Sequence, residues 1–303
     1  MKAIVIGFGS IGMRHARLLD KLGCKVAVVS SRIIEWDCHY FSLTEALQIE
    51  EPDYVIVANR TSEHYKTLHE LSRNGFKGTV LVEKPLFDQE NEVPPNDFQN
   101  LYVGYNLRFH PGIKKLKSYL ENEKILSFHV YTGQYLPQWR PQIDYRTAYS
   151  SRKEDGGGVL RDLSHELDYV NWLLGGWERL TALGGQFSSL EINSDDIFSI
   201  LLQTKKCPVV TININYMDRL AKRFVIVNTE NNTIKLDMIN NEIVVNDEKE
   251  TFEVPRDFTY IEQHTAVLNG NMQDLCSLDE AIEVMGMIKA VEEANLEQRW
   301  IRK

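Results

Sequence analysis

The sequence predicts an α/β protein of two domains: a doubly wound parallel sheet first, then an α+β domain with a largely antiparallel open sheet. The chain has 303 residues, enough for about two domains of ordinary size. Apolar runs alternate with helical segments in the first third, which is typical of parallel β-α-β units. Short β-rich runs follow one another later, which is typical of an antiparallel sheet. We place the boundary at Gly104, giving domains of residues 1–104 and 105–303.

Composition narrows the class of protein. Apolar residues make up 43% of the chain and charged residues 25%, which is ordinary globular composition. The formal net charge of -9 argues against non-specific binding to nucleic acid or to anionic membranes. No apolar run reaches the roughly 20 residues of a membrane span, and the first residues lack a signal-peptide cleavage site. The cysteines are scattered without a CxxC pair, so we expect a reduced, cytoplasmic protein with no metal site.

The first element is a strand over residues 2–6, because KAIVI is short, apolar and rich in β-branched side chains. GFGSIG and a helix over residues 13–23 follow it. In this strand–turn–helix context Gly7 permits the tight turn, Gly9 lets the backbone approach a pyrophosphate, and Gly12 lets the helix pack on the strand. The free N–H groups at the start of the helix favour phosphate. The sequence therefore predicts a Rossmann dinucleotide site that includes Gly7, Phe8, Gly9, Ser10, Ile11 and Gly12.

The second strand is expected over residues 25–30, and the side chains at its end affect the selectivity between NAD and NADP. An NAD site commonly places Asp or Glu there, where it binds the ribose 2′-hydroxyl. Here the chain reads Ser30-Ser31-Arg32, with no carboxylate to repel a 2′-phosphate and with two hydroxyls and a guanidinium to bind one. We therefore expect a preference for NADP(H), with NAD(H) as the alternative cofactor. The competing interpretation is an arginine that is simply exposed on a loop.

The alternation of strands and helices continues. We expect a strand over Tyr54–Ala58, a helix over about 62–74 and a strand over Val80–Val82. Ligands of open α/β sheets bind beyond the carboxyl ends of the strands. The residues that follow these strand ends are therefore further candidates for cofactor contacts: Ala58, Asn59, Arg60, His64, Glu83 and Lys84.

The stretch GGGVLRDLSHELDYVNWLLGG, from Gly156 to Gly176, predicts one helix bounded by glycines. Its apolar stripe, which we take as the core face, consists of Leu160, Leu163, Leu167, Val170 and Leu174. The opposite face carries Asp162, His165, Tyr169 and Trp172. Aromatic side chains beside a histidine are more typical of the wall of a cleft than of a solvated face, because they combine an apolar body with a polar end. The alternative is a surface histidine beside two aromatic residues.

The remainder of the second domain reads as strands and two closing helices. The predicted strands cover residues 125–135, 179–187, 197–204, 209–216, 223–228, 233–238 and 242–245. Closing helices are expected over about 258–275 and 278–297, and Ser277 and Glu280 form a capping-box signature at the start of the second.

The segment from Gln134 to Asp155 is too long for a simple connection, so we expect a binding loop or lid. Arginines suit phosphates or carboxylates, and tyrosines suit sugar faces and hydroxyls. The candidates for substrate contacts in this loop and in the YNLRF segment are Arg108, Arg140, Tyr145, Arg146 and Tyr149. A sugar nucleotide or an acidic sugar is the expected substrate class. The alternative is that these side chains only pack the loop.

In this order, the motifs resemble those of the glucose–fructose oxidoreductase, inositol dehydrogenase and MocA family. The likeness is carried by GFGSIG, DYVIVANRTSEH (53–64), VEKP (82–85), VGYNLRFHP (103–111) and GGGVLRDLSHELD (156–168). GxGxxG occurs in many families, whereas EKP followed by YNxRF and a GG…D…H…D helix is much more specific. Residues 133–158 further resemble a bacterial branch often associated with cell-surface sugar pathways.

The resemblance implies an NAD(P)-dependent oxidoreductase acting on CH–OH groups of sugars, cyclitols or sugar nucleotides. It implies that Lys84 and His165 are catalytic, and that subunits pair through the C-terminal sheet as a homodimer or homotetramer. We also expect substrate contacts from Lys84, Asp162, His165 and Tyr169. Many members space the helix Asp and His four residues apart, whereas Asp162 and His165 are three apart, which leaves a catalytic role of Asp162 open. The stretch between EKP and VGYN is short and contains Pro94-Pro95, so the helix usual there is expected to be truncated.

The chemistry expected is hydride transfer at a carbinol carbon. The O–H of that carbinol must lose a proton, which needs a general base, and the developing alkoxide needs a cation. Histidine exchanges a proton near neutral pH, and a lysine ammonium polarises the oxygen. Which of Lys84 and His165 is the immediate proton partner stays open. Two other functions also stay open: a non-catalytic sensor of a sugar or dinucleotide, and a reductase of a non-sugar acceptor.

Overall fold

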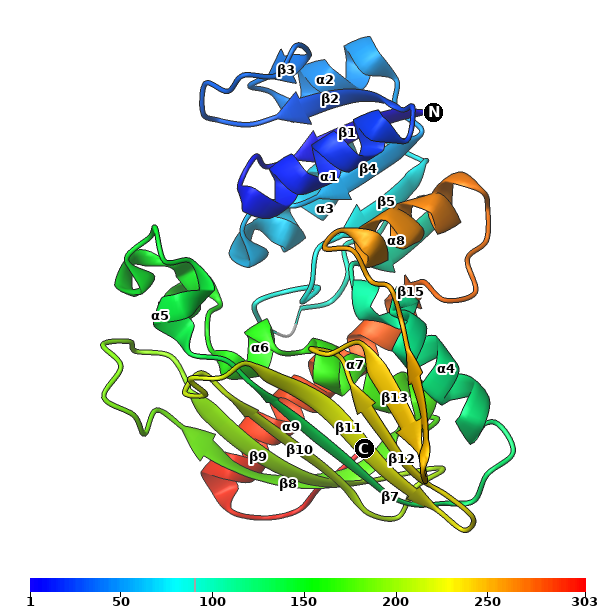
Figure 1. Ribbon diagram of the computed structural model, residues 1–303. Helices are drawn as coiled ribbons and strands as arrows, with labels where there is room; N and C mark the ends of the chain where they lie inside the picture. The colour runs from blue at the N-terminus through cyan, green and yellow to red at the C-terminus, as the bar shows by residue number, and fades with distance from the viewer. Residues whose placement is uncertain (90) are drawn as a thin grey trace. The chain divides into compact units, whose positions relative to one another are not determined.

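The structure is a computed structural model that describes residues 1–89 and 91–303 (Figure 1). The chain forms two compact units: residues 1–106 with 257–282, and residues 107–256 with 283–303. The first crossing lies close to the expected boundary at Gly104. The return of residues 257–282 differs from the expected division, because this segment packs on the first unit through a helix and an edge strand.

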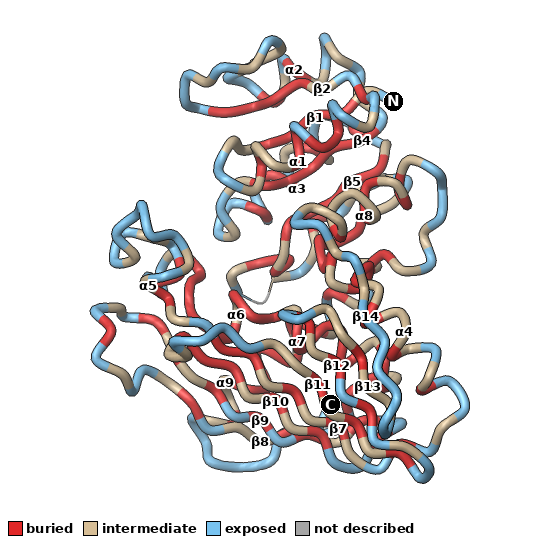
Figure 2. Tube along the Cα trace, viewed as in Figure 1, coloured by how far each residue is buried: buried red, intermediate tan, exposed pale blue. Residues whose placement is uncertain are grey.

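A mostly parallel sheet forms the centre of the first unit. Among the described residues its strand order is β15-β6-β5-β4-β1-β2-β3, and only the edge strand β15 is antiparallel to its neighbour. Its strands are β1 Lys2–Ile6, β2 Lys25–Val29, β3 His39–Tyr40, β4 Tyr54–Val57, β5 Thr79–Val82, β6 Asn100–Val103 and β15 Cys276–Ser277. The central strands are buried along nearly their whole length, as Figure 2 shows, because helices cover a parallel sheet on both faces. This confirms the predicted doubly wound sheet.

The helices of the first unit largely match the periodicity of the sequence. They are α1 Ser10–Lys21, α2 Leu43–Glu50, the short η1 Thr61–Glu63, α3 His64–Arg73 and α8 Phe258–Leu268. The helix expected over 258–275 ends early, because Gly270 has φ +70° and the chain then extends into β15. No helix occurs between Pro85 and Gln99 in the part of this stretch that the structure describes, which confirms the expected truncation.

The second unit contains a nine-stranded sheet. Among the described residues its order is β14-β13-β12-β11-β7-β10-β9-β8-β16, and neighbouring strands are antiparallel except for β7 with β10. The strands are β7 Ile125–Gly133, β8 Trp177–Gly185, β9 Ile197–Thr204, β10 Val210–Asn215, β11 Lys222–Thr229, β12 Thr233–Asp237, β13 Glu242–Val245, β14 Glu248–Thr251 and β16 Ile301–Arg302. The predicted α+β domain with a largely antiparallel sheet is therefore confirmed.

One face of this sheet is covered by helices and the other is open. The covering helices are α4 Pro111–Leu120, α6 Val159–Asp162, α7 His165–Leu173 and α9 Leu278–Glu297, and Figure 1 shows α9 running across the sheet. Asn295 of α9 accepts a hydrogen bond from the backbone of Gly184 in β8, and Ser277 and Glu280 form the predicted capping box. No helix among the described residues is long and apolar enough to cross a membrane.

Candidate active site

The glycine loop between β1 and α1 has the geometry that a dinucleotide requires. Gly7 has φ +93°, and a Cβ atom at Gly12 would lie 2.1 Å from the Gly7 carbonyl oxygen, so both positions exclude a side chain. A Cβ atom at Gly9 would meet nothing within 4 Å, which leaves open space above the loop for a ligand. Gly9 caps α1, and no side chain of residues 1–89 or 91–303 accepts a capping hydrogen bond from the first turn of the helix. These free donors and the open approach fit a pyrophosphate.

Arg32 lies against the same loop. Its guanidinium donates a hydrogen bond to the carbonyl oxygen of Phe8 over 2.6 Å. Its backbone N–H donates to the hydroxyl oxygen of Ser30, which is buried, whereas Ser31 and Arg32 are exposed. The structure therefore brings the second-strand residues Ser30–Arg32 and the glycine loop together, and no carboxylate lies among the three.

The end of β4 supplies the next predicted residues. Ala58 is buried beneath Gly7, and Arg60 is exposed. The amide nitrogen of Asn59 donates to Thr67 over 2.8 Å, while its Oδ1 is buried without a hydrogen-bond partner among the described residues. A buried acceptor without a partner at a strand end fits a ligand that donates a hydrogen bond there.

His64, at the start of α3, holds the turn that follows Lys84. Its Nδ1 lies 3.2 Å and 3.1 Å from the carbonyl oxygens of Pro85 and Leu86, so Nδ1 carries the proton and donates. Burial lowers the pKa of His64, so its ring is neutral. His64 therefore fixes the backbone of the loop beyond β5, a contact that the sequence did not predict.

Glu83 and Lys84 come directly after β5, and the peptide bond from Lys84 to Pro85 is cis. Glu83 turns inward: its Oε1 lies 2.8 Å from Nε2 of His15, and its Oε2 accepts the backbone N–H of Lys84. Burial would raise the pKa of Glu83, but the hydrogen bond and charge of His15 and the charge of Lys84 hold it below the ordinary value. Glu83 is thus an ionised group beneath the loop, while Lys84 is partly exposed.

In the second unit, the single helix expected over 156–176 is wrong. The chain forms α6, breaks at Leu163 and Ser164, and resumes as α7 with His165 as its first residue. The break changes which side chains share a face, since the rule of 100° per residue holds only within one continuous helix.

Asp162, the last residue of α6, is the centre of a buried cluster. The hydroxyl of Tyr216 donates to its Oδ2 over 2.6 Å. Burial, and then the Asp162 carboxylate, raise the pKa of Tyr216; the same two causes raise the pKa of the Tyr149 phenol, although the residue as a whole is 37% exposed. Asp162 is 6% exposed, and His165 is half-buried. Tyr216 was missed by the sequence reasoning, and the alternation of TININYM along β10 is the one signal that could have marked it.

Arg108 and Tyr169, which the sequence analysis names as candidates for substrate contacts, are both buried in the structure. Arg108 is 1% exposed and forms a bidentate ion pair with Asp168, with Nη2 to Oδ1 at 2.6 Å. Its guanidinium also stacks 4.9 Å from the ring centre of Trp172. Tyr169 is 0% exposed, and its hydroxyl has no hydrogen-bond partner among the described residues. Both side chains therefore lie in the interior of the second unit, where Asp168 is also buried.

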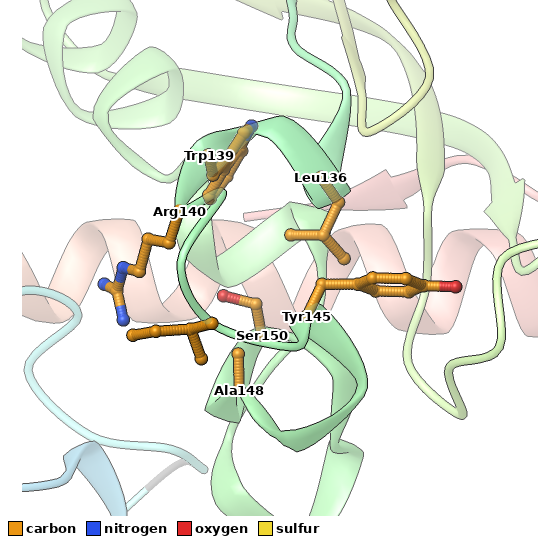
Figure 3. Close-up of a pocket in the computed structure, with 7 residues that line it drawn as sticks. Leu136, Trp139, Arg140, Tyr145, Ala148 and Ser150 are labelled. Carbon is orange, nitrogen blue, oxygen red and sulfur yellow. The ribbon is translucent and has the colours of Figure 1, made fainter.

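The long loop carries its own small pocket. The loop contains α5 Leu136–Trp139 and the short helices η3 Tyr145–Thr147, η4 Tyr149–Ser151 and η5 Lys153–Asp155. Figure 3 shows the lining side chains, which are Leu136, Trp139, Arg140, Ile143, Tyr145, Ala148 and Ser150. Arg140 and Tyr145, two of the candidates for substrate contacts, both line this pocket.

Arg146 differs from that expectation. Its guanidinium is already held by Asp144 at 2.7 Å and by Glu191 at 3.1 Å, on the exposed side of the loop. These two carboxylates hold the pKa of Arg146 above its ordinary range and leave little attraction for a further anion.

Two family models match the chain. Residues 1–94 match an oxidoreductase family model with an NAD-binding Rossmann fold, and residues 113–233 match the GFO/IDH/MocA C-terminal domain. Together the matches cover more than two thirds of the chain.

The curated relatives are between 24% and 28% identical over the aligned residues. The uncharacterized oxidoreductase YrbE of Bacillus subtilis is 28% identical over 56% of this chain and 53% of its own length. Myo-inositol 2-dehydrogenase of Thermotoga maritima is 26% identical over 58% of this chain and 55% of its own length. The 2,7-anhydro-N-acetylneuraminate hydratase of Escherichia coli is 26% identical over 77% of this chain and 67% of its own length. The chain thus spans about half the length of the first two relatives.

Solved structures share the fold over the whole chain. The WlbA dehydrogenase from Bordetella pertussis, in complex with NADH and UDP-GlcNAcA, has a TM-score of 0.82 at 18% identity and covers 100% of this chain and 98% of its own. Levoglucosan dehydrogenase in complex with NADH has a TM-score of 0.85 at 14% identity, and the match covers 100% of this chain and 98% of its own. At this identity the likeness shows the fold alone.

Proposed function

The chain belongs to the Gfo/Idh/MocA family, and on that premise we propose that it is an NAD(P)-dependent oxidoreductase that acts on a CH–OH group of a sugar or sugar nucleotide. The observation that carries the proposal is the loop from Gly7 to Gly12, which combines open space at Gly9 with free N–H donors at the start of α1. The bound dinucleotide would accept or supply the hydride.

We propose that NADP(H) is the preferred cofactor. Arg32 is exposed, bound to the Phe8 carbonyl of the glycine loop, and flanked by the serines at the end of β2. A guanidinium with remaining donors binds a phosphate well, whereas an NAD site usually places a carboxylate at this position. Related structures contain NAD or NADH, so this selectivity is a property proposed for this chain and rests on Arg32.

In the proposed reaction, Lys84 and His165 act on the same carbinol oxygen. As the carbon loses hydride to the nicotinamide, the O–H loses a proton to one of these two side chains, and a carbonyl forms. The Lys84 ammonium stabilises the developing negative charge, and His165 exchanges a proton. Asp162 binds a substrate hydroxyl or orients His165, and Tyr216 holds its carboxylate in place. Reduction uses the same groups in reverse.

We propose a sugar nucleotide or an acidic sugar as the substrate, in bacterial surface-polysaccharide synthesis. Carboxylate and phenol groups around Asp162 suit sugar hydroxyls, and the loop pocket adds aromatic surface and the cation of Arg140. The WlbA structure, which holds UDP-GlcNAcA, supports this class. A second candidate is a reaction without net oxidation, because one curated relative is a hydratase. Product analysis separates it, since such a product appears without net consumption of the dinucleotide.

We further propose that the protein is cytoplasmic and forms a homodimer or homotetramer through the open face of its nine-stranded sheet. That face mixes apolar and polar side chains, including Leu183, Leu201, Phe224 and Tyr131. Phe224 and Tyr131 stack at 5.4 Å, which gives the face a flat aromatic centre.

The first experiment is a parallel titration with NADPH and NADH, following nicotinamide fluorescence, on wild type and Arg32→Ala. We expect NADPH to bind more tightly, and Arg32→Ala to weaken NADPH binding by about tenfold or more while changing NADH binding little. Arg17→Ala, an exposed arginine of α1, is the matched control and should behave as wild type. Tighter binding of NADH contradicts the selectivity, and absence of binding contradicts the oxidoreductase.

The second experiment assays a panel of sugars and sugar nucleotides with Lys84→Ala and His165→Ala. Each variant should lower turnover by roughly 100-fold or more while dinucleotide affinity stays close to wild type. Full turnover in either variant refutes the role of that residue.

A further inference from the structure

Four buried side chains of the first unit form a continuous row that ends at the residue before Lys84. We name Tyr54, His264, His15 and Glu83 the relay. The hydroxyl of Tyr54 lies 3.1 Å from Nδ1 of His264, and Nε2 of His264 lies 2.8 Å from Nδ1 of His15. Nε2 of His15 lies 2.8 Å from Oε1 of Glu83. Tyr54, His15 and His264 are each 0% exposed, so bulk water does not compete for the hydrogen bonds between them.

The relay joins elements that are far apart in the chain. His15 lies on α1 just beyond the glycine loop, Tyr54 begins β4, and His264 lies on α8, in the segment that returns to the first unit. Buried polar groups cost stability unless each finds a partner, and here every ring nitrogen of both histidines has one.

The direction of the last link does not depend on the tautomers of the histidines. Burial, and then the charge of His15, lower the pKa of His264 well below its ordinary value, so His264 is neutral. A neutral His15 accepts from His264 at Nδ1 and donates from Nε2, whereas a charged His15 donates from both nitrogens. In both cases Nε2–H of His15 donates to Glu83, because an ionised carboxylate only accepts.

The Glu83 carboxylate also contacts the backbone of Lys84 and packs against Gly104. Its second oxygen accepts the backbone N–H of Lys84 over 3.1 Å. A Cβ atom at Gly104 would lie 3.2 Å from the Glu83 carboxyl carbon and from Oε1, so the glycine makes room for the carboxylate. One carboxylate therefore joins α1, the Lys84 backbone and the end of β6.

We propose that His15 and His264 are positioning residues for Lys84: through the relay they keep Glu83 ionised and in place, and Glu83 fixes the backbone and the electrostatic surroundings of the Lys84 side chain. The role assigned to Lys84 rests on the proposed function, but the relay itself does not. The relay thereby makes α8 a structural part of the turn that carries Lys84.

Several groups besides the relay face Glu83. Lys84 follows it, His64 of α3 and Tyr260 of α8 contribute to its surroundings, and Arg14 of α1 stacks on the Tyr260 ring at 5.1 Å. Of these, Lys84 supports the ionised form directly through its charge and its backbone N–H. Removal of His15 should therefore weaken, but not abolish, the preference of Glu83 for the ionised form.

The Lys84 N–H is a direct reporter of Glu83, since its proton resonance shifts when the carboxylate that it contacts gains a proton. We propose to follow it in full-length protein labelled with 15N-lysine, between pH 8 and pH 4, with Lys84→Arg to assign the resonance. In wild type the resonance should stay constant until well below pH 5. In His15→Leu its midpoint should move up by about one pH unit or more, because burial then acts on a carboxylate that has lost its main donor.

Three further variants make the result specific. His15→Gln keeps an amide N–H close to the position of Nε2, so the midpoint should return most of the way to the wild-type value. His264→Leu removes the support of His15 and should give an intermediate shift. Gln263→Leu is the matched control, because Gln263 is the neighbouring buried residue of α8 and its amide has no hydrogen-bond partner among the described residues.

An unchanged midpoint in His15→Leu overturns the relay. If His15→Leu does not fold, the midpoints of the Lys84 resonance in His264→Leu and Gln263→Leu are compared instead. A higher midpoint in His264→Leu supports the relay, and equal midpoints in the two variants overturn it.

An activity measurement keeps the two proposals apart. With an active substrate, kcat of His15→Leu should fall relative to wild type as the pH drops through the midpoint of its Lys84 resonance, and should be closest to wild type at pH 8, with dinucleotide affinity unchanged. If the Lys84 resonance shifts as expected but wild type turns over no substrate, the proposed function fails and the relay stands. If wild type is active and the resonance does not shift, the relay fails alone.

Discussion

At the scale of single residues, burial separates polar side chains that serve the fold from those that can meet a ligand. Arg108 and Asp162 both read as functional in the sequence, and both are buried. The charge of Arg108 is paired with Asp168, whereas the Asp162 carboxylate, three residues before half-buried His165, accepts a hydrogen bond from the neutral hydroxyl of Tyr216. A buried ion pair leaves no charge for a substrate, but a carboxylate held by a phenol retains its own.

Tyr216 and Tyr169 form a matched pair for testing the Asp162 cluster. Both are 0% exposed; the Tyr216 hydroxyl donates to the Asp162 carboxylate, whereas the Tyr169 hydroxyl has no hydrogen-bond partner in the part of the chain that the structure describes. We expect Tyr216→Phe to lower the free energy of unfolding by about 2 kcal/mol, because a hydrogen bond to a buried charged group is lost. Tyr169→Phe should be neutral or slightly stabilising. Urea unfolding at pH 7 measures both, and equal losses would contradict the assignment.

At the scale of elements, the glycine loop and the broken helix show two kinds of local control. The loop conformation depends on its glycines, since a side chain at Gly7 or Gly12 would clash with backbone atoms. The break between α6 and α7 depends instead on distant partners: Tyr216 holds Asp162, and Arg223 of β11 binds Glu166 at 2.8 Å. Periodicity in one segment contains no information about those partners.

The loop makes a prediction that separates folding from cofactor binding. Gly9→Ala should leave the thermal midpoint within about 2 °C of wild type, because φ at Gly9 is −77° and nothing lies within 4 Å of the added Cβ. It should weaken dinucleotide binding by about tenfold or more, since the methyl group occupies the pyrophosphate approach. Gly12→Ala should lower the thermal midpoint as well. Thermal unfolding and the fluorescence titration measure both; unchanged affinity in Gly9→Ala would place the phosphates elsewhere.

At the scale of the whole molecule, buried histidines set the response to acid. Burial lowers the pKa of His64, His110 and His264, so these rings stay neutral in the folded protein while the unfolded chain takes up protons below about pH 6.5. The free energy of unfolding should therefore fall as pH drops below 6.5, by up to about 1.4 kcal/mol per pH unit for each such ring. Glu83, whose pKa is lowered in the fold, adds a loss at lower pH as it gains a proton.

Urea midpoints at pH 7.5, 6.5 and 5.5 measure this slope. His110→Gln should reduce the slope below pH 6.5 relative to wild type, since one of the three rings is then absent. A slope that does not change in this variant, or a protein that becomes more stable as pH falls to 5.5, would contradict the assignment of neutral buried rings.

The open sheet face makes the prediction for assembly. Leu201 and Thr211 are cross-strand neighbours on it, and Leu201 is 39% exposed. Leu201→Glu should convert the proposed oligomer to monomer in light scattering, because a charge in the centre of an apolar contact is not solvated. Glu178→Lys, an exposed change on the same sheet, is the control. A wild-type protein that is already monomeric at micromolar concentration would refute the interface.

Much of the architecture was predictable because its signals are local. The strand–glycine–helix order, the alternation of the first third and the capping box at Ser277 each depend on residues within a few positions of one another. The EKP turn was predictable as a site for the same reason. Lys84 and His165 were identified by motif, and their roles rest on the proposed function.

The fold class, the glycine loop and the Ser30-Ser31-Arg32 segment could be identified from the amino-acid sequence, because they depend on backbone conformation and short-range patterning. Which titratable groups pair with one another inside the protein could be seen only in the folded chain. Arg108 meets Asp168 across sixty positions of chain, and His15 meets His264 across far more. The physical reason is that burial and pairing arise from distances between elements, and no periodicity within either element encodes such a distance.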